Sequence, residues 1–116
     1  MSGKVVLDTN CLLMAISSRS RYYPVWQSFL QGEYTLCVTT DILEEYEEVL
    51  ARNINQRVAQ YILSALLERA NVQMVDVFFR FRLITADPDD NKFVDCAIAS
   101  NARYIVTEDR HFEVLE

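Results

Sequence analysis

The chain has 116 residues, of which 51% are hydrophobic and 24% charged, which is enough to build one core and predicts a single domain over residues 1–116. Its 11 basic and 17 acidic residues give a formal net charge of -6, which excludes a basic nucleic-acid clamp as a property of the whole protein. No apolar run approaches the roughly 20 residues of a membrane span, and the N-terminus lacks a signal-peptide layout. Cys11, Cys37 and Cys96 lie in apolar runs without metal-binding spacing, which is typical of reduced, buried thiols in a cytoplasmic protein.

Strand-like and helix-like segments alternate along the chain. In chain order the pattern predicts a strand at 4–7, helices from about 11 to 16 and from 24 to 32, a strand at 35–38, helices at 41–52 and 56–70, a strand at 72–75, a helix at 90–101 and a last strand at 104–107. Residues 78–84 are ambiguous, and 87–90 form a turn. This alternation is typical of an α/β fold in which helices cover both faces of a parallel sheet.

Acidic residues follow the first and the last predicted strands. Asp8 comes directly after the first strand, and Asp109 comes two residues after Thr107. Parallel sheets place their functional sites outside the carboxyl ends of the strands, so we expect both side chains at that edge. Each alone is also typical of a helix cap or a turn.

The helix predicted at 41–52 carries four glutamates, Glu44, Glu45, Glu47 and Glu48. At about 100° per residue, Glu44 and Glu48 point away from the apolar stripe, whereas Glu45 and Glu47 lie on its two flanks. Only a flanking carboxylate can reach a cleft while its helix packs on the sheet, and Glu45 is nearer the helix start. We therefore expect Glu45 at the carboxyl edge, and Glu44 and Glu48 in solvent.

The helix predicted at 90–101 has an apolar stripe that, extended back by one turn, points through Asp90. A carboxylate on the inward face of a helix needs a partner that satisfies it. Asp95 falls about 130° off the stripe, which predicts either a solvent-facing side chain or one that supports a site from behind. The pattern therefore favours Asp90 as the third acid, with Asp89 as a turn residue.

Four carboxylates from distant parts of the chain, Asp8, Glu45, Asp90 and Asp109, are thus expected at one edge of the sheet. Like charges a few ångströms apart cannot all stay ionised without a counterion. The sequence has one histidine, His111, and no nearby cluster of Lys or Arg that could serve as this counterion. A hard divalent cation such as Mg²⁺ prefers such oxygen ligands and commonly acts on phosphates. Bound there, it would generate a nucleophile from water and clamp a scissile phosphate.

Four segments in this order span nearly the whole chain: 5–10 (VVLDTN), 42–50 (ILEEYEEVL), 87–97 (DPDDNKFVDCA) and 104–109 (YIVTED). Together they resemble the PIN-domain family of metal-dependent ribonucleases, especially the VapC-like toxins of toxin–antitoxin pairs. The resemblance implies a three-layer α/β/α sandwich, Mg²⁺ or Mn²⁺ as cofactor, RNA as substrate and a cognate antitoxin as partner.

The resemblance also implies roles for single residues. By position, four residues match the acidic cluster of the family: Asp8, Glu45, Asp90 and Asp109. The polar support positions are matched by Thr9, Asn10 and Thr107, and Asp95 is a further supporting candidate.

Two features depart from the family's pattern. Asp89, Asp90 and Asp95 all lie within the third motif, so the identity of the third acid stays open. The family chain usually continues into a final strand, whereas this one stops at residue 116. Either the product is truncated or the sheet is one strand short, and a missing strand would expose an edge that favours association.

Two other classes of function stay open. A PIN-like module could hold RNA or a protein without cutting, although all four acids are kept. A phosphate-handling enzyme or a receiver domain could use Asp8 as its nucleophile. Against this, Asn10 stands where a haloacid-dehalogenase-type site needs a second Asp, and a receiver needs an acidic pair and a Lys that are missing here.

Basic and aromatic side chains indicate where RNA and a partner would bind. The candidates for phosphate contact are Arg19, Arg21, Arg80, Arg82, Lys92 and Arg110. The stretch 22–30 carries more large apolar side chains than one helix face can bury, which predicts an exposed patch. We therefore expect a homodimer, or a complex with an antitoxin, that buries part of this stretch. The alternative is that it packs under the helix around 58–66.

Overall fold

The fold is described from a computed structural model, which covers residues 3–76, 91–106 and 111–113. The ambiguous segment 78–84 and the predicted turn at 87–90 lie outside these residues. So do the predicted site residues Asp90, Thr107 and Asp109 and the phosphate-contact candidates Arg80, Arg82 and Arg110.

Within the described residues, five strands form one sheet in the order β3-β2-β1-β4-β5. The parallel strands are β1 (Lys4–Leu7), β2 (Thr35–Val38), β3 (Val72–Met74) and β4 (Tyr104–Val106). They confirm the predicted strands and the parallel sheet.

One strand was not predicted. The segment 104–107 was expected to be the last strand, but β5 (His111–Glu113) follows and pairs antiparallel with β4. Only residues 107–110 separate the two strands. A parallel return would need a crossover of about a dozen residues, so this short connection dictates the antiparallel pairing.

The register brings the carboxyl ends of the parallel strands to one edge. Leu7 of β1 lies opposite Val106 of β4, and Val38 of β2 lies opposite Met74 of β3. The central strand β1 is buried at Val5, Val6 and Leu7. Whatever follows these strands in the sequence therefore emerges at the same side of the molecule.

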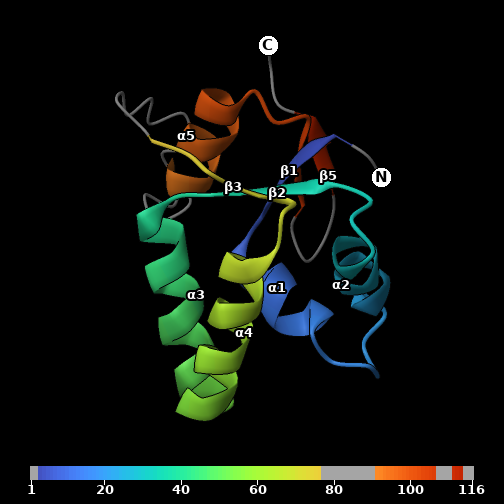
Figure 1. Cartoon of the computed structure of the whole chain (residues 1–116), viewed down its shortest axis with the longest axis vertical. Helices are drawn as coiled ribbons and strands as arrows, with labels where there is room; N and C mark the ends of the chain where they lie inside the picture. The colour runs from blue at the N-terminus through green and yellow to red at the C-terminus, as the bar shows by residue number, and fades with distance from the viewer. Residues whose placement is uncertain (1–2, 77–90, 107–110, 114–116) are drawn as a thin grey trace.

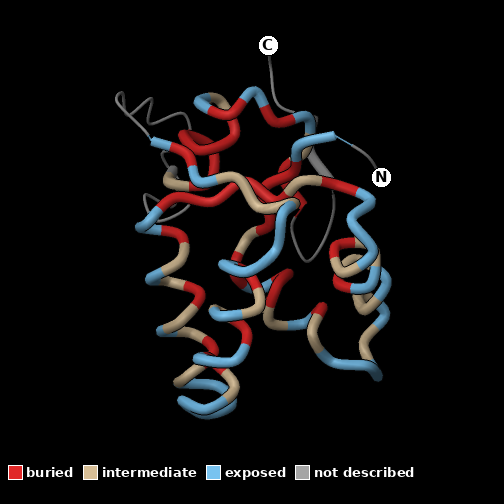
Figure 2. Tube along the Cα trace, viewed as in Figure 1, coloured by how far each residue is buried: buried red, intermediate tan, exposed pale blue. Residues whose placement is uncertain are grey.

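In the part of the chain that the structure describes, five helices cover the sheet: α1 (Thr9–Ala15), α2 (Tyr23–Leu30), α3 (Thr40–Asn53), α4 (Gln56–Glu68) and α5 (Asn91–Ser100). Figure 1 shows α5 on one face of the sheet and the other helices on the opposite face, which confirms the three-layer α/β/α architecture. The buried residues gather along the strands and on the helix sides that face them (Figure 2). Among the described residues, no helix has the length and apolar character to cross a membrane.

Side-chain caps explain where the helices begin. The side chains of Asp8, Thr39 and Asn55 accept hydrogen bonds from backbone amides in the first turns of α1, α3 and α4 respectively. Pro24 lies in the first turn of α2, and Gly32 follows its end with a positive φ of 76°.

The three cysteines are buried and free, as expected. Burial raises the pKa of the Cys96 thiol to about 12, and it also raises the pKa of Cys37. Because a reactive cysteine needs an accessible thiolate, these side chains behave as small core residues.

The expected surplus of apolar surface in the stretch 22–30 is not present. Trp26 and Phe29 are buried, and Phe29 lies between Trp26 and Tyr34 with ring centroids 5.3 and 6.1 Å away. The neighbouring apolar side chains are partly buried against the same core. The prediction failed because α2 packs against α1 and Tyr34, so more than one face of the helix is covered.

The fully buried Tyr46 of α3 ties this helix to the end of β1. Its hydroxyl donates a hydrogen bond of 2.6 Å to the carbonyl oxygen of Leu7. Burial raises the pKa of Tyr46 well above its ordinary value, so the hydroxyl keeps the proton that it donates. The residues next to this bond, Asp8 directly after β1 and Glu45 on α3, are thereby held close to each other.

We expect Tyr46→Phe to lower the free energy of unfolding by about 1–3 kcal/mol, because it leaves the buried Leu7 carbonyl without its donor. Urea unfolding followed by circular dichroism measures this loss. The control is Tyr61→Phe, since Tyr61 is 72% exposed and its loss should stay within about 0.5 kcal/mol. Equal stabilities of the two variants would contradict the anchoring role of Tyr46.

Candidate metal centre

Asp8 lies at the carboxyl edge of the sheet, directly after β1. Its backbone N–H donates to the carbonyl of Val106 at 3.0 Å, which holds it against the end of β4. Its Oδ1 accepts from the amide of Cys11 at 2.7 Å and so caps α1. Asp8 was expected either to cap a helix or to lie at the carboxyl edge of the sheet. The structure shows both, because this half-buried residue caps α1 and directly follows the end of β1.

Glu45 reaches this edge from α3. Its side chain is 26% exposed, whereas Glu44 and Glu48 on the outer face are exposed, as the helix phase predicted. The hydroxyl of Thr9, the residue after Asp8, donates to Glu45 Oε2. Thr9 is buried, so this bond fixes the glutamate against the β1–α1 turn.

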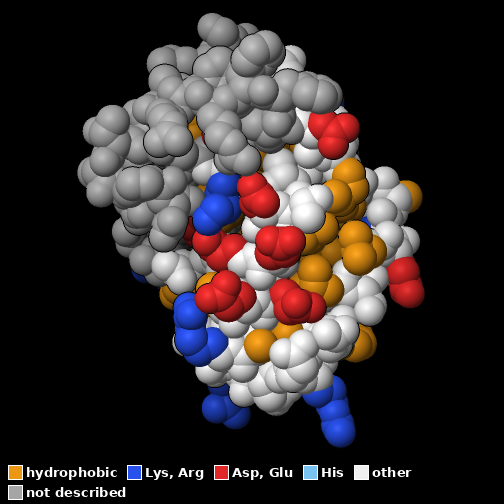
Figure 3. Space-filling model, turned by 90° about the vertical axis from the view of Figure 1, so that its left-hand side faces the viewer, with side chains coloured by type: hydrophobic (Ala, Val, Ile, Leu, Met, Phe, Trp, Pro, Cys, Tyr) orange, Lys and Arg blue, Asp and Glu red, His pale blue; other side chains and the backbone are white. Residues whose placement is uncertain are grey.

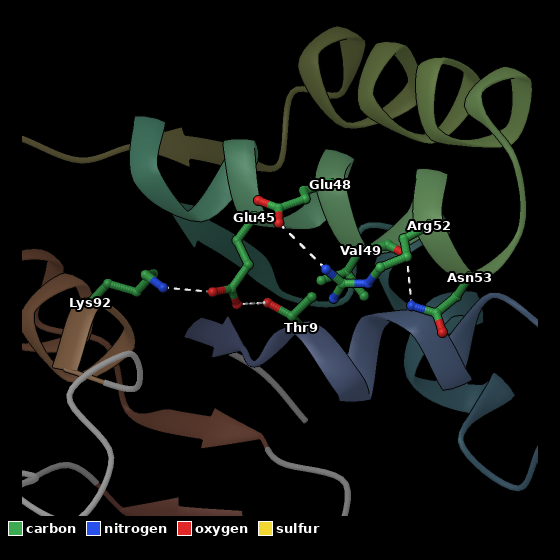
Figure 4. Close-up of polar contacts among 7 residues, drawn as sticks. All are labelled: Thr9, Glu45, Glu48, Val49, Arg52, Asn53 and Lys92. Carbon is green, nitrogen blue, oxygen red and sulfur yellow. Dashed lines mark hydrogen bonds and ion pairs between the residues drawn. The ribbon is translucent and has the colours of Figure 1, made fainter.

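Lys92 of α5 holds the other oxygen of the same carboxylate. Its Nζ donates to Glu45 Oε1 at 2.6 Å, and its side chain is 21% exposed (Figure 4). Because α3 and α5 lie on opposite faces of the sheet, this ion pair joins the two helical layers around the carboxyl edge (Figure 1). The sequence suggested Lys92 only as an RNA contact. Its pairing with Glu45 depends on the relative placement of two helices, for which one chain carries no local signal.

Asp95 is 2% exposed, so the solvent-facing alternative for this residue is wrong. The prediction assumed that α5 buries one stripe. Instead α5 packs on β1, β2 and β4 and also against α3, and five consecutive residues of the helix, 93–97, are buried. The supporting role remains a prediction for Asp95.

A hollow of about 150 Å³ lies next to Lys92. Its walls are the start of α3 with Thr39, Thr40 and Asp41, the segment after β3 with Val75 and Asp76, and Lys92 and Asp95 of α5. Figure 3 looks onto this side and shows acidic side chains gathered beside the residues that are not described. The hollow is therefore more acidic than basic.

The remaining predicted residues are not brought to Glu45 by the described structure. Asn10 is exposed on the first turn of α1. Arg19 and Arg21 are exposed and follow the far end of α1, about 10 Å along the helix from Asp8. The Arg21 guanidinium donates to the Tyr22 hydroxyl at 3.1 Å and lies 5.1 Å from the centre of its ring. Local contacts therefore engage Arg21.

The donors present fit a hard divalent cation. The carboxylates of Asp8 and Glu45 and the hydroxyl of Thr9 are oxygen ligands of the kind that Mg²⁺ and Mn²⁺ prefer. Within residues 3–76, 91–106 and 111–113, no group of three or more acidic, cysteine or histidine side chains could hold a metal. A complete set would need Asp90, directly before α5, and Asp109, which follows β4 in the sequence.

Comparisons with known proteins agree with this fold. The sequence profile of the PIN domain matches residues 4–111. Among solved structures, VapBC2 from Rickettsia felis bound to a DNA fragment from their promoter shares the fold, with 21% identity, a TM-score of 0.59, and coverage of 85% of this chain and 83% of that chain. None of the curated proteins compared with the chain matches it. Because the family profile covers nearly the whole sequence, the chain belongs to the PIN-domain family.

Proposed function

We propose that this protein is a metal-dependent endoribonuclease that acts as the toxin of a toxin–antitoxin pair. The observation that carries the proposal is the meeting of the Asp8 turn and Glu45 at the carboxyl edge of a PIN-domain sheet. We assign Asp8, Glu45, Asp90 and Asp109 as the ligands of Mg²⁺ or Mn²⁺. The likeness to VapBC2 supports an antitoxin as the partner.

The residues of the chain prepare this site before any substrate binds. The Cys11 amide fixes the Asp8 carboxylate through Oδ1, and the Thr9 hydroxyl fixes Glu45 through Oε2. Orienting both groups in advance avoids reorganisation during the reaction. A divalent cation held by Asp8 and Glu45 would supply Lewis-acid stabilisation of the scissile phosphate and activation of a water. Thr107 and Asn10 remain proposed supports of the acidic cluster.

RNA is the proposed substrate despite the net charge of -6. Four of the acidic charges belong to the proposed cluster, which a divalent cation would neutralise in part. Arg19, Arg21 and Arg110 are the proposed phosphate contacts beyond the cluster. A homodimer stays a proposal, and it no longer has support from exposed apolar side chains in α2.

We expect the purified protein to cleave a mixed RNA panel with Mg²⁺ or Mn²⁺ and to stop when a chelator is added. Asp8→Asn and Glu45→Gln should each lower the cleavage rate by at least roughly 10–100-fold. That is the loss expected when a residue that only orients a metal ligand is changed, and loss of a ligand itself should cost no less. Asn caps a helix about as well as Asp, so the fold of Asp8→Asn should survive.

The matched control is Glu44→Gln, which removes an exposed carboxylate next to Glu45 and should cleave at the wild-type rate. Full cleavage by Asp8→Asn would contradict the metal-nuclease proposal. Specific RNA binding without cleavage in any metal would favour the alternative, a PIN-like binding module.

A second prediction separates Asp90 from Asp95. Asp90→Asn should abolish Mn²⁺ binding and cleavage, whereas Asp95→Asn should be clearly milder, because the apolar pattern of the sequence, extended back by one helical turn, passes through Asp90. Mn²⁺ titration of each variant measures the difference. Since Asp95 is buried, circular dichroism must first show that Asp95→Asn is folded. The reverse ranking would make Asp95 the third acid.

A further inference from the structure

Both oxygens of the Glu45 carboxylate accept hydrogen bonds from side chains of the protein. Lys92 Nζ donates to Oε1 at 2.6 Å, and the Thr9 hydroxyl donates to Oε2 (Figure 4). A metal cation that binds this carboxylate therefore has to share it with two donors, the neutral hydroxyl of Thr9 and the positively charged ammonium group of Lys92.

A second ion pair, between Arg52 and Glu48 one turn further along α3, serves as a comparison for the distance and exposure of the pair of Lys92 and Glu45. Arg52 Nη1 lies 3.4 Å from Glu48 Oε1, and these side chains are 65% and 71% exposed. Such a solvated pair contributes little. The pair of Lys92 and Glu45 is shorter and mostly shielded, with side chains only 21% and 26% exposed, so its electrostatic attraction is screened far less.

We propose that Lys92 is a built-in counterion that competes with the divalent cation for Glu45. This inference rests on the proposed function, because it concerns the same metal site. The Thr9 hydroxyl is neutral and can keep donating to one oxygen while the other binds metal. The ammonium group carries the same sign of charge as the metal and holds the oxygen opposite to the one held by Thr9, so the two cations repel each other and metal binding favours displacement of the lysine.

The hollow beside Lys92 offers the displaced ammonium group a place to go. Lys92 lines this hollow together with the carboxylates of Asp41 and Asp76 and the buried Asp95. The flexible four-carbon stem of a lysine lets its charged group turn from Glu45 toward this acidic lining. Exchange of partners thus keeps the lysine near negative charge in both states.

The test compares Mn²⁺ binding, measured by calorimetry and electron paramagnetic resonance, for the wild type, Lys92→Met and Arg52→Met. Lys92→Met keeps a long side chain and removes the competing charge. We expect it to bind Mn²⁺ about tenfold more tightly, equivalent to about 1.4 kcal/mol. Arg52→Met loses the same unit charge from an exposed pair, so it should bind as the wild type does.

Stability without metal is the second readout. Lys92→Met should unfold at lower urea concentration than the wild type in the presence of a chelator, because Glu45 loses its counterion. A purely structural role of Lys92 would weaken folding and Mn²⁺ binding together, whereas competition weakens the first and strengthens the second. If Lys92→Met does not fold, Lys92→Gln replaces it, with the same expected gain in affinity.

Equal or weaker Mn²⁺ binding by the folded Lys92 variant would overturn this inference and leave the proposed function intact, provided that the wild type binds Mn²⁺. If neither protein binds Mn²⁺, both the inference and the proposed function are wrong. Tighter binding by the Arg52 variant to the same extent would also overturn the inference, because net charge alone would then explain the gain.

Discussion

The carboxylate of Glu45 is the junction on which the candidate site depends. It joins α3 to the β1–α1 turn through Thr9 and to α5 through Lys92, although these elements are far apart in the sequence. The two helical layers lie on opposite faces of the sheet, and this contact links them around its carboxyl edge (Figures 1 and 4). The adjacent Tyr46 anchors the same turn of α3 to Leu7 from inside the core. The site is therefore positioned by packing that also stabilises the fold.

An acidic edge of this kind has a cost in the absence of metal, because like charges repel and partly buried carboxylates need partners. The described part of the chain offers three such partners: an amide for Asp8, and a hydroxyl and an ammonium group for Glu45. The first two orient the ligands and can stay when a cation binds. The third is itself a cation, which turns the same contact into a competitor for the metal.

The sequence predicted the parts of this site that follow from local rules. Asp8 was found because it ends a buried strand of a parallel sheet, and Glu45 because helix geometry separates it from its exposed neighbours. The burial of Asp95 and the ion pair of Lys92 with Glu45 were not predicted, for one common reason. The surroundings of α5 depend on two layers packed around it, and a single apolar stripe does not report how many sides of a helix are covered. The strand β5 was missed because its sequence, HFE, has one apolar residue between two polar ones, whereas β3 (VQM) and β4 (YIV), which have the same length, carry two and three.

The most direct test of this account is the position of the bound cation. In a ¹⁵N NMR titration, paramagnetic Mn²⁺ broadens the signals of amides near it. We expect the amides of Thr9, Glu45 and Lys92 to broaden first, while those of Arg52 at the far end of α3 and Tyr61 on α4 stay sharp. Broadening centred on the exposed glutamates of α3, or spread without preference over the acidic surface, would contradict a metal centre at the carboxyl edge of the sheet.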